Sequence, residues 1–502
     1  MIDPIELEVI AGALRAACEE MGAVLIRSAY SPNIKERRDC SAAIFDAAGE
    51  MVMQAEHIPV HLGSMPAALA AVLDEHHRPG RSWILNDPFA GGTHLPDITV
   101  ITPAFTPDET LLGFAVTRAH HADVGGATPG SMPADSRSLA EEGVVIAPQP
   151  LSQESIERLI VTMRQPDQRR ADLRAQLAAN MAGAARLADL AARIGVQRLR
   201  EGNAAVLDYA ERRMRACISA LPDGARSAKD VLEAREGDLE LCLQATVRGQ
   251  EITLDFTGSA PQHEGNLNCP LAVTRSACMF AMRVLTDPDI PASTGAFRPV
   301  HVIAPYGSLL NAKSPAAVAA GNVETSSRVA DLVLAAFGRA LGQGTMNNLT
   351  LGNEHFAYYE TIGGGQGACP DADGPSAVHV AMSNTLNTPI EALERELPLR
   401  VTVYAVRRGS GGAGIHKGGD GVVRELQARE PMSFSLITER RRHRPPGAAG
   451  GQPGHAGRNL LFRAAEEHAA QELPPKVSGI LSAGDRLRIE TPGGGGHGCP
   501  KC

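Results

Sequence analysis

The feature that most limits the possible folds is a change of pattern part-way along the chain. Residues 153–222 are rich in Ala, Leu and Arg, with helical periodicity, which predicts one short and two long helices with a break near Gly195 or Gly202. Most of the remaining chain consists of short β-prone runs separated by Gly, Pro, Asp and Asn. Because helices and strands do not alternate regularly, the pattern favours an α+β fold, with mixed β-sheets and a central long-helix segment, over a doubly wound sheet.

A chain of 502 residues is too long for one ordinary hydrophobic core, so we expect a multi-domain protein. Asp3 and Pro4 can cap and begin an N-terminal helix, and buried helices are expected at 270–285 and 324–341. After residue 343 the chain is mostly β and loop. Four segments follow from these patterns: an N-terminal α+β region with a candidate metal site (1–150), a helical segment (151–225), a middle α+β region (226–345) and a β- and loop-rich C-terminal region (346–502).

Charge and hydropathy exclude two classes of partner. The net charge is −9, and no extended basic tract with interleaved aromatic residues occurs, so a nucleic-acid partner is not expected. No uncharged apolar run is long enough for a transmembrane helix, and the N-terminus lacks the basic region of a signal peptide. The nine cysteines follow no regular framework, which is typical of a reducing compartment. We therefore expect a cytoplasmic protein without a membrane partner.

Two glycine-bounded loops carry most of the candidate metal ligands. In "NDPFAGGTHLPDIT" (86–99), Pro96 favours extended backbone, so His94 and Asp97 lie in a loop that leads into a strand. The strand-like run "LLGFAVTRA" leads to "HHADVGG", a second loop. Neighbouring strands would bring the two loops together, and two histidines with one carboxylate suit Mn²⁺, Zn²⁺ or Fe²⁺. The second loop contributes His120, His121 and Asp123.

Other polar side chains are candidates for the surroundings of such an ion. In "KERRDCSAAIFD", Glu36 and Asp39 are candidates for a general base or an extra ligand, although a helix-end cluster of ion pairs is the alternative. In "EHIPVHLGSMP", His57 and His61 are candidates for pocket residues or for partners of the ligands, with satisfied polar side chains as the alternative.

Three stretches dense in Asn and Gly suit a polar small-molecule pocket, and equally suit tight turns. They are "EGNLNCP", "GNVETSSR" and "GTMNNLT". The candidate substrate-binding residues that they supply are Asn268, Asn322, Glu324 and Asn347.

The C-terminus has two unusual features. Cys499 and Cys502 form a Cys-x-x-Cys pair with His497 nearby, which can hold zinc or be redox active, but at a chain end such a pair is usually without function. The glycine run 493–496 suits a backbone that passes close to a pocket or a partner. The chain has no Gly-x-x-x-x-Gly-Lys-Ser/Thr loop for nucleoside triphosphates and no Gly-x-Ser-x-Gly nucleophile elbow.

Taken together, these motifs resemble the hydantoinase B/oxoprolinase family, the B-type subunits of ATP-dependent cyclic-amide hydrolases. The matching stretches extend over nearly the whole chain and include "NIKERRDCSAAIFD", "NDPFAGGTHLPDIT", "RAHHADVGGATPGSMP", "AAGNVETSSRVAD" and "GSGGAGIHKGGDGVVRE". The final "HGCPKC" departs from the family's usual ending, an aromatic residue followed by Gly-Asp-Pro.

The resemblance implies a division of labour between two subunits. An A-type subunit with an actin-like ATPase fold would bind ATP and phosphorylate an oxygen of a small cyclic amide, and this chain would complete ring opening at one divalent metal ion. The assembly would be a hetero-tetramer. Carried onto this sequence, the family's metal-binding pattern falls on His94, Asp97 and His120, and the doubled histidine leaves His120 and His121 as alternatives. The proton would pass to Asp123 or Asp39, and Glu36 and His121 are the further catalytic candidates.

Two other functions fit the same motifs. The related large subunits of acetone-type carboxylases use this scaffold with bicarbonate-derived carbon in place of water, so an ATP-dependent ketone carboxylase subunit is one alternative. A non-catalytic subunit that only supports an ATPase partner is the other.

Overall fold

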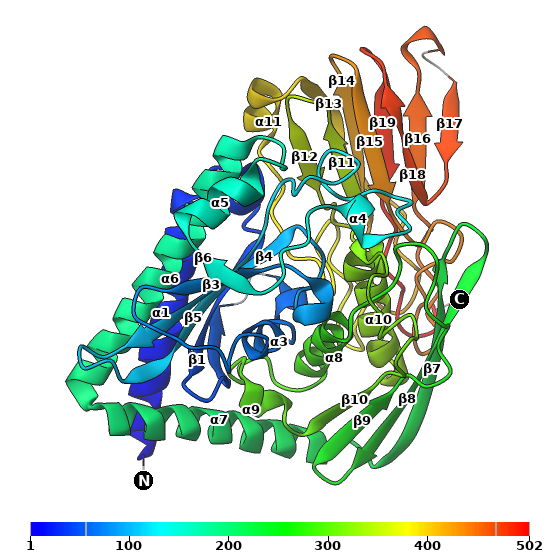
Figure 1. Ribbon diagram of the computed structural model, residues 1–502. Coiled ribbons are helices and arrows are strands. Elements are labelled where there is room, and N and C mark those ends of the chain that lie inside the picture. The colour runs from blue at the N-terminus through cyan, green and yellow to red at the C-terminus, as the bar shows by residue number, and fades with distance from the viewer. Residues whose placement is uncertain (1, 56–57, 467–468, 501–502) are drawn as a thin grey trace.

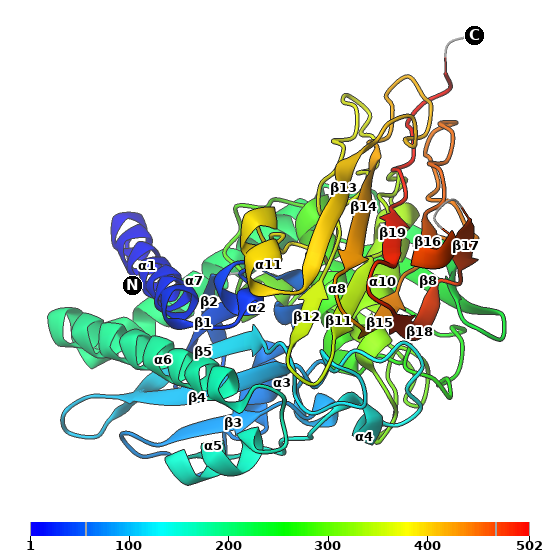
Figure 2. The ribbon, with the colours of Figure 1, turned by 90° about the horizontal axis from the view of Figure 1, so that it is seen from above.

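The computed structural model of the protein describes residues 2–55, 58–466 and 469–500, which form four β-sheets and the helices around them (Figure 1). This arrangement confirms the predicted α+β fold. The long helices lie along one side of the first sheet, and the last two sheets stand at the opposite end of the molecule (Figure 2).

The first sheet has the strand order β2-β1-β5-β4-β3-β6. Its strands are β1 (Cys40–Asp46), β2 (Met51–Ala55), β3 (Ser82–Leu85), β4 (Asp97–Phe105), β5 (Leu111–His120) and β6 (Gln149–Leu151). Helices α1 (Pro4–Ser28) and α6 (Pro166–Ile194) cover one face, and α3 (Met65–Ala70) packs on the other. Because both faces are covered, nearly every residue of β4 and β5 is buried.

The three helices predicted within residues 153–222 are present. The Asp3 carboxylate accepts hydrogen bonds from the backbone N–H groups of Ile5 and Glu6, so α1 begins at Pro4 as expected. The short helix is α5 (Gln153–Ile160), and the two long helices are α6 and α7 (Val196–Ser219). The break lies at Gly195, whose φ of 87° is one that side chains rarely adopt. Gly202 instead lies inside α7.

The second sheet has the order β10-β9-β8-β7 and packs against two central helices. Its strands are β7 (Gly224–Glu233), β8 (Asp238–Arg248), β9 (Glu251–Asp255) and β10 (Val300–Ile303), and the helices are α8 (Leu271–Leu285) and α10 (Ser326–Ala336). Helix α8 confirms the prediction for 270–285. The prediction for 324–341 was too long, because the chain turns at Gly338, where φ is 72°. A π-helical turn, η3 (Gly321–Thr325), precedes α10.

The C-terminal part is mostly β and loop, as predicted. The third sheet contains β11 (Asn348–Gly352), β12 (Ala357–Glu360), β15 (Met432–Ile437) and β18 (Lys476–Leu481). The fourth contains β13 (Leu399–Arg407), β14 (Gly421–Ala428), β16 (Arg458–Phe462), β17 (Ala470–Leu473) and β19 (Arg486–Glu490). The shorter helices are α2 (Pro32–Lys35), α4 (Leu139–Glu142), α9 (Thr294–Phe297), α11 (Ile390–Glu396), η1 (Pro59–His61), η2 (Pro88–Ala90) and η4 (Ala464–Glu466).

The largest hydrophobic cluster joins the second sheet and its helices to side chains as far apart in sequence as Ile58 and Ile437. The boundaries of the four predicted segments stay a prediction.

The glycine run 493–496 passes between other loops of this chain. The N–H of Gly494 donates to the Gly419 carbonyl, and the Gly494 carbonyl accepts from Gly412. A Cβ atom on Gly494 would lie 2.0 Å from the carbonyl oxygen of Gln366. The run therefore lies against neighbouring backbone, where a side chain has no room.

We expect Gly494→Ala to lower the free energy of unfolding by about 3 kcal/mol, because the added methyl group must displace backbone atoms. Gly12→Ala is the matched control, since its Cβ would meet nothing within 4 Å in helix α1. The control should be neutral or more stable by up to about 1 kcal/mol. Denaturant unfolding of both variants measures the difference, and equal stabilities would contradict the close packing.

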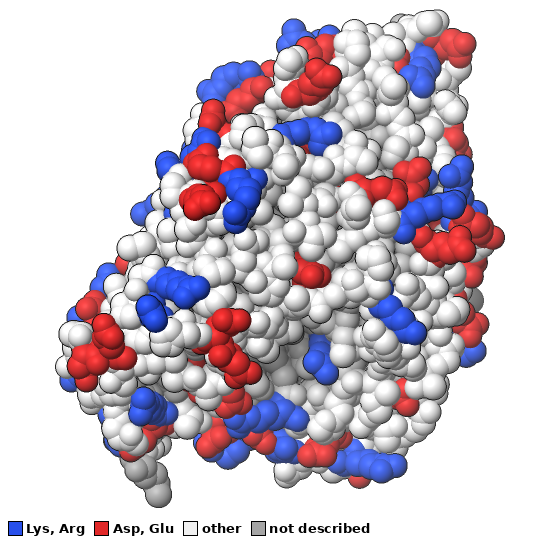
Figure 3. Space-filling view, viewed as in Figure 1, with Lys and Arg blue, Asp and Glu red and all other residues white. Residues whose placement is uncertain are grey.

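In the described part of the chain, no helix is long and apolar enough to span a membrane. On the face shown in Figure 3, Lys and Arg alternate with Asp and Glu around a band with few charges. The charges on this face do not form one basic surface.

Candidate metal centre

The pairing of β4 with β5 brings the two predicted loops together. The strands are antiparallel, and Asp97 at the start of β4 lies directly opposite His120 at the end of β5. His94 lies in the turn before β4, where its carbonyl accepts the Asp97 N–H at 3.1 Å. The segment is a loop that leads into a strand, as Pro96 predicted.

Three side-chain atoms form a nearly equilateral triangle. His94 Nε2 lies 3.1 Å from His120 Nδ1, and each nitrogen lies 3.2 Å from Asp97 Oδ1. All three residues are buried. Within the described ranges, this is the one group of at least three His, Cys, Asp or Glu side chains placed to share an ion.

The triangle fits a divalent metal ion. An ion about 2.1 Å from three adjacent ligand atoms holds those atoms about 3.0–3.4 Å apart. Two histidines and one carboxylate on one side of the ion leave its other positions open for small molecules. The set suits Mn²⁺, Zn²⁺ or Fe²⁺ and does not distinguish among them.

Neighbouring side chains keep Asp97 ionised. Burial acts to raise its pKa, but His94, His120 and His61 together hold the pKa of Asp97 well below its usual range. Thr93 Oγ1 donates to Asp97 Oδ2 at 2.6 Å. A carboxylate that stays charged and has a fixed orientation is suited to metal binding.

His61 lies in the same pocket. Its Nδ1 is 2.9 Å from Ser41 Oγ, and its Nε2 lies 3.5 Å from Asp97 Oδ2. Burial lowers the pKa of His61, which favours the neutral ring. His57 falls outside the described residues, so its predicted role stays a prediction.

Asp39 is the second carboxylate in the pocket. Its backbone carbonyl accepts the His120 N–H at 3.0 Å, so the residue is held next to the candidate ligand. Burial raises the pKa of Asp39, although His120 and Arg37 act in the opposite direction. A buried carboxyl group with a raised pKa is suited to accept a proton.

Three of the predicted catalytic residues lie outside this pocket. His121 follows His120 directly, and successive side chains of a strand point to opposite faces, so its Nε2 contacts Gln176 Oε1 of α6 at 2.9 Å. Asp123 accepts hydrogen bonds from Gly130 and forms an ion pair with Arg164 at 3.0 Å. Glu36 is partly exposed at the end of α2 and does not line the pocket.

Of the six predicted substrate-binding residues, His61 and Asn322 line the pocket, and Asn322 Oδ1 has no hydrogen-bond partner among the described residues. The Asn268 side chain binds the backbone of His263 and holds a turn. Asn347 adopts a φ of 49° and binds Gln343. These two positions match the alternative interpretation, tight turns.

Glu324 is buried beside Val323 and Met346, which line the pocket. Its Oε1 accepts hydrogen bonds from Thr345 Oγ1 at 3.0 Å and from the Met346 N–H at 3.2 Å, while its Oε2 has no hydrogen-bond partner in the described residues. Burial, with repulsion from Glu439, raises the pKa of Glu324 from 4.5 to about 8. The folded protein therefore keeps a proton here that the unfolded chain loses above about pH 4.5.

Stability should fall as pH rises through this window, and Glu324→Gln should remove the loss because the amide does not titrate. Relative to the parent protein, the variant should gain about 4 kcal/mol between about pH 5 and about pH 9. Denaturant unfolding at the two pH values measures the gain. Glu354→Gln, at an exposed position, is the control and should show none. A gain for Glu324→Gln that is independent of pH would contradict the assignment.

Several pocket residues were not predicted as site residues. The Tyr359 ring stacks on the His120 ring at 4.5 Å with an interplanar angle of 16°, and the Arg37 guanidinium lies 4.7 Å from the Tyr359 ring centroid. The "SNT" of residues 383–385 also lines the pocket. The density of Asn, Ser and Thr in "SNTLNT" is a signal that could have suggested a polar pocket lining here. The remaining unpredicted lining residues are Ile58, Val60, Val323, Met346, Thr361 and Met382.

Cys499 does not line the described site. Cys499 is exposed, and Cys502 lies outside the described residues. The backbone of His497 pairs with that of His416. The predicted lack of function of the cysteine pair stays a prediction.

Comparisons with known proteins identify the family of this chain. The sequence profile described as hydantoinase B/oxoprolinase matches residues 3–500. 5-oxoprolinase 1 of Arabidopsis thaliana is 39% identical over 99% of this chain, which spans only 42% of that protein. The B-type subunit of a putative D-/L-hydantoinase from Pseudomonas sp. is 29% identical, with 99% of this chain and 90% of that protein covered. The crystal structure of the ATP-dependent caprolactamase from Pseudomonas jessenii superposes with a TM-score of 0.92 at 28% identity, covering 99% of this chain and 92% of that chain. The chain belongs to the hydantoinase B/oxoprolinase family.

Proposed function

We propose that this chain is the metal-containing B-type subunit of an ATP-dependent cyclic-amide hydrolase that opens a hydantoin, 5-oxoproline or lactam ring. The observation that carries the proposal is the triangle of His94, Asp97 and His120 in a buried pocket beside Asp39. The names of the relatives support the reaction class, since they include an oxoprolinase, a hydantoinase and a caprolactamase.

The reaction needs both an activated carbonyl group and an activated water. An amide carbonyl is a poor electrophile because its nitrogen lone pair is delocalised. Phosphorylation of the amide oxygen by a partner subunit would turn the ring carbon into one that water can attack. A divalent ion held by His94, Asp97 and His120 would supply Lewis-acid polarisation and lower the pKa of water.

The other pocket residues have roles that follow from their positions. Asp39 would accept the proton of the attacking water as its oxygen bonds to the ring carbon, and would pass that proton to the ring nitrogen as the C–N bond breaks. This step would leave an acyl phosphate, from which a second water would release inorganic phosphate to give the carboxylic acid. His61 would hold the orientation of Asp97. Asn322 Oδ1, which has no hydrogen-bond partner in the described part of the chain, would accept a hydrogen bond from the ring N–H. Val60 and Met346 line the same pocket and would help to exclude bulk water.

ATP chemistry would belong to a partner, an A-type subunit with an actin-like ATPase fold, in a hetero-tetramer. The sequence has no Gly-x-x-x-x-Gly-Lys-Ser/Thr loop to hold phosphates. The hydantoinase relative is named as one subunit of its enzyme, which supports a companion chain.

We expect the isolated chain to show no ATP hydrolysis above background, and addition of the A-type subunit to restore substrate-dependent ATP turnover. A coupled assay for ADP release measures both. Substantial ATPase activity from this chain alone would contradict the division of labour.

The reaction itself is tested with the copurified complex. We expect a panel of lactams, hydantoins and 5-oxoproline to include a substrate that is converted to a ring-opened amino or carbamoyl acid. Incubation with labelled bicarbonate distinguishes ring opening from ketone carboxylation, because label in the product would identify a carboxylase. A complex that binds metal but converts no member of either class would favour a scaffold role.

A further inference from the structure

The pocket around the three candidate ligands is too small for a substrate. Its volume is about 20 Å³, which leaves room for a single water molecule. A five-membered cyclic amide has six non-hydrogen atoms in its ring and carbonyl group, so it needs the space of several water molecules. Part of the pocket wall must therefore move before a ring can reach the ligands.

A much larger cavity lies on the other side of that wall. It has a volume of about 620 Å³, within the usual range for small-molecule sites. Ser383 and Asn384 line both spaces. Residues 59–62 also separate the two spaces. Val60 lines the metal pocket, whereas Pro59 and Leu62 line this outer cavity. The two spaces are therefore neighbours, separated by one layer of chain.

The wall segment, residues 378–386, is attached firmly at its two ends. Val378 donates a backbone hydrogen bond to the Gly364 carbonyl, and Leu386 donates one to the Arg37 carbonyl. Between them, the Ser383 N–H bonds within the segment, to Val380, and its hydroxyl contacts His379 Nδ1.

Ala381 lies in the middle of the wall segment with a φ of 49°. A left-handed backbone costs a residue other than glycine of order 1–3 kcal/mol, and such positions gather at ligand clamps and switches. The segment has fixed ends and a strained centre.

The outer cavity has the lining that a compact cyclic amide requires. Phe280, Val284 and Leu334 supply an apolar surface for ring carbons. Gln366 and His379, with the two wall residues, supply hydrogen-bonding groups for an amide. Arg283 also lines the cavity, and its guanidinium already donates to the carbonyls of Pro288 and Ile290.

We propose that the outer cavity is the site where the cyclic amide first binds, and that displacement of the wall segment at Ser383 and Asn384 admits the ring to the metal pocket. This inference rests on the proposed function, for which it supplies the route of the substrate.

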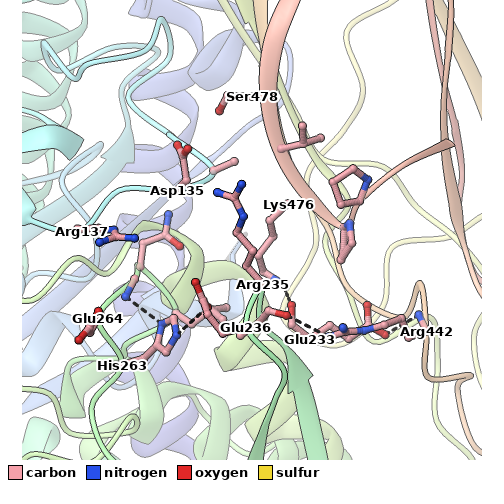
Figure 4. A pocket seen from close by; sticks show the side chains of 18 residues that line it. Asp135, Arg137, Glu233, Arg235, Glu236, His263, Glu264, Arg442, Lys476 and Ser478 are labelled. Carbon is pink, nitrogen blue, oxygen red and sulfur yellow. Dashed lines mark hydrogen bonds and ion pairs between the residues drawn. The ribbon is translucent and has the colours of Figure 1, made fainter. Parts of the chain in front are cut away.

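A second cavity of similar size provides an internal control. The cavity in Figure 4 has a volume of about 570 Å³, and none of its lining residues lines the metal pocket. Charged side chains such as Arg235 and Glu236 surround it, and Ser478 of β18 stands at its edge (Figure 4). A bulky residue placed here should leave the route to the metal pocket open.

The first experiment needs no metal. Val284→Trp, at a half-exposed position of α8, would place a bulky ring at the outer cavity, and Ser478→Trp would do the same at the control cavity. Binding of 2-pyrrolidone to the metal-free full-length chain is measured by ligand-observed NMR. We expect Val284→Trp to weaken binding at least tenfold and Ser478→Trp to leave it unchanged. Unchanged binding in Val284→Trp, or loss in Ser478→Trp alone, would overturn the proposal.

The second experiment follows access to the metal. The chain is loaded with Co²⁺, and the rate at which acetohydroxamate changes the visible spectrum is measured by stopped flow. We expect Val284→Trp to slow this association at least tenfold, and His379→Phe, which releases Ser383, to speed it about threefold. Equal rates in all variants would refute the route while leaving the metal site intact. Failure of the parent protein to bind Co²⁺ would instead refute the proposed function, and the NMR experiment would still decide the cavity.

Discussion

Replacement of His120 by Asn should lower the metal content from about one ion per chain to less than about a tenth, whereas His121→Asn should leave it unchanged. The two residues are adjacent and both are buried, so the pair is a matched test. His120 Nδ1 faces Asp97 across the strand pair, but His121 points to Gln176 on α6. Elemental analysis after gel filtration measures the ion, and unfolding curves confirm that each variant folds.

Loss of the ion should reduce turnover of the complex at least about a thousandfold, since the missing polarisation is worth several kcal/mol. The double variant His94→Ala, Asp97→Ala should also lose the ion. Full occupancy in that variant would place the metal elsewhere, with the C-terminal cysteines next to be tested. Metal loss in His121→Asn with retention in His120→Asn would reverse the assignment of the two histidines.

The second large effect is expected at Asp39. Asp39→Asn should lower kcat about 100- to 10,000-fold while the ion is retained, because the amide cannot accept the proton of the attacking water. Glu36→Gln changes a carboxylate in the same stretch that is partly exposed and does not line the pocket. That control should stay within about twofold of the parent protein.

Measurement of metal content together with single-turnover kinetics distinguishes the roles of Asp39. Loss of the ion in Asp39→Asn would make Asp39 an additional ligand. Equal losses of activity in Asp39→Asn and Glu36→Gln, with the ion retained, would contradict the assignment of the buried Asp39 as the proton acceptor.

Local patterns in the sequence were enough to predict much of the fold. The cap at Asp3, the glycine at 195 and the apolar spacing of the long helices depend on neighbours within a few residues, so they could be recognised without a structure. The helix expected at 324–341 was less accurate, because its π-helical start and its end before Gly338 depend on how α10 packs. The boundaries of the four segments are harder still to predict from sequence, because one hydrophobic cluster joins residues as far apart as Ile58 and Ile437.

For the site, the sequence alone determined the two His/Asp loops, the strands that carry them and the resemblance to the family, because these are properties of contiguous stretches. Only the tertiary structure decided which members of those loops meet. His120 and His121 have the same chemistry, and the alternation of side chains at the end of β5 turns one toward Asp97 and the other toward α6. Likewise, Tyr359 and the wall at Ser383 reach the pocket from elements more than 200 residues away from His120. Long-range packing, which no local pattern encodes, brings them there.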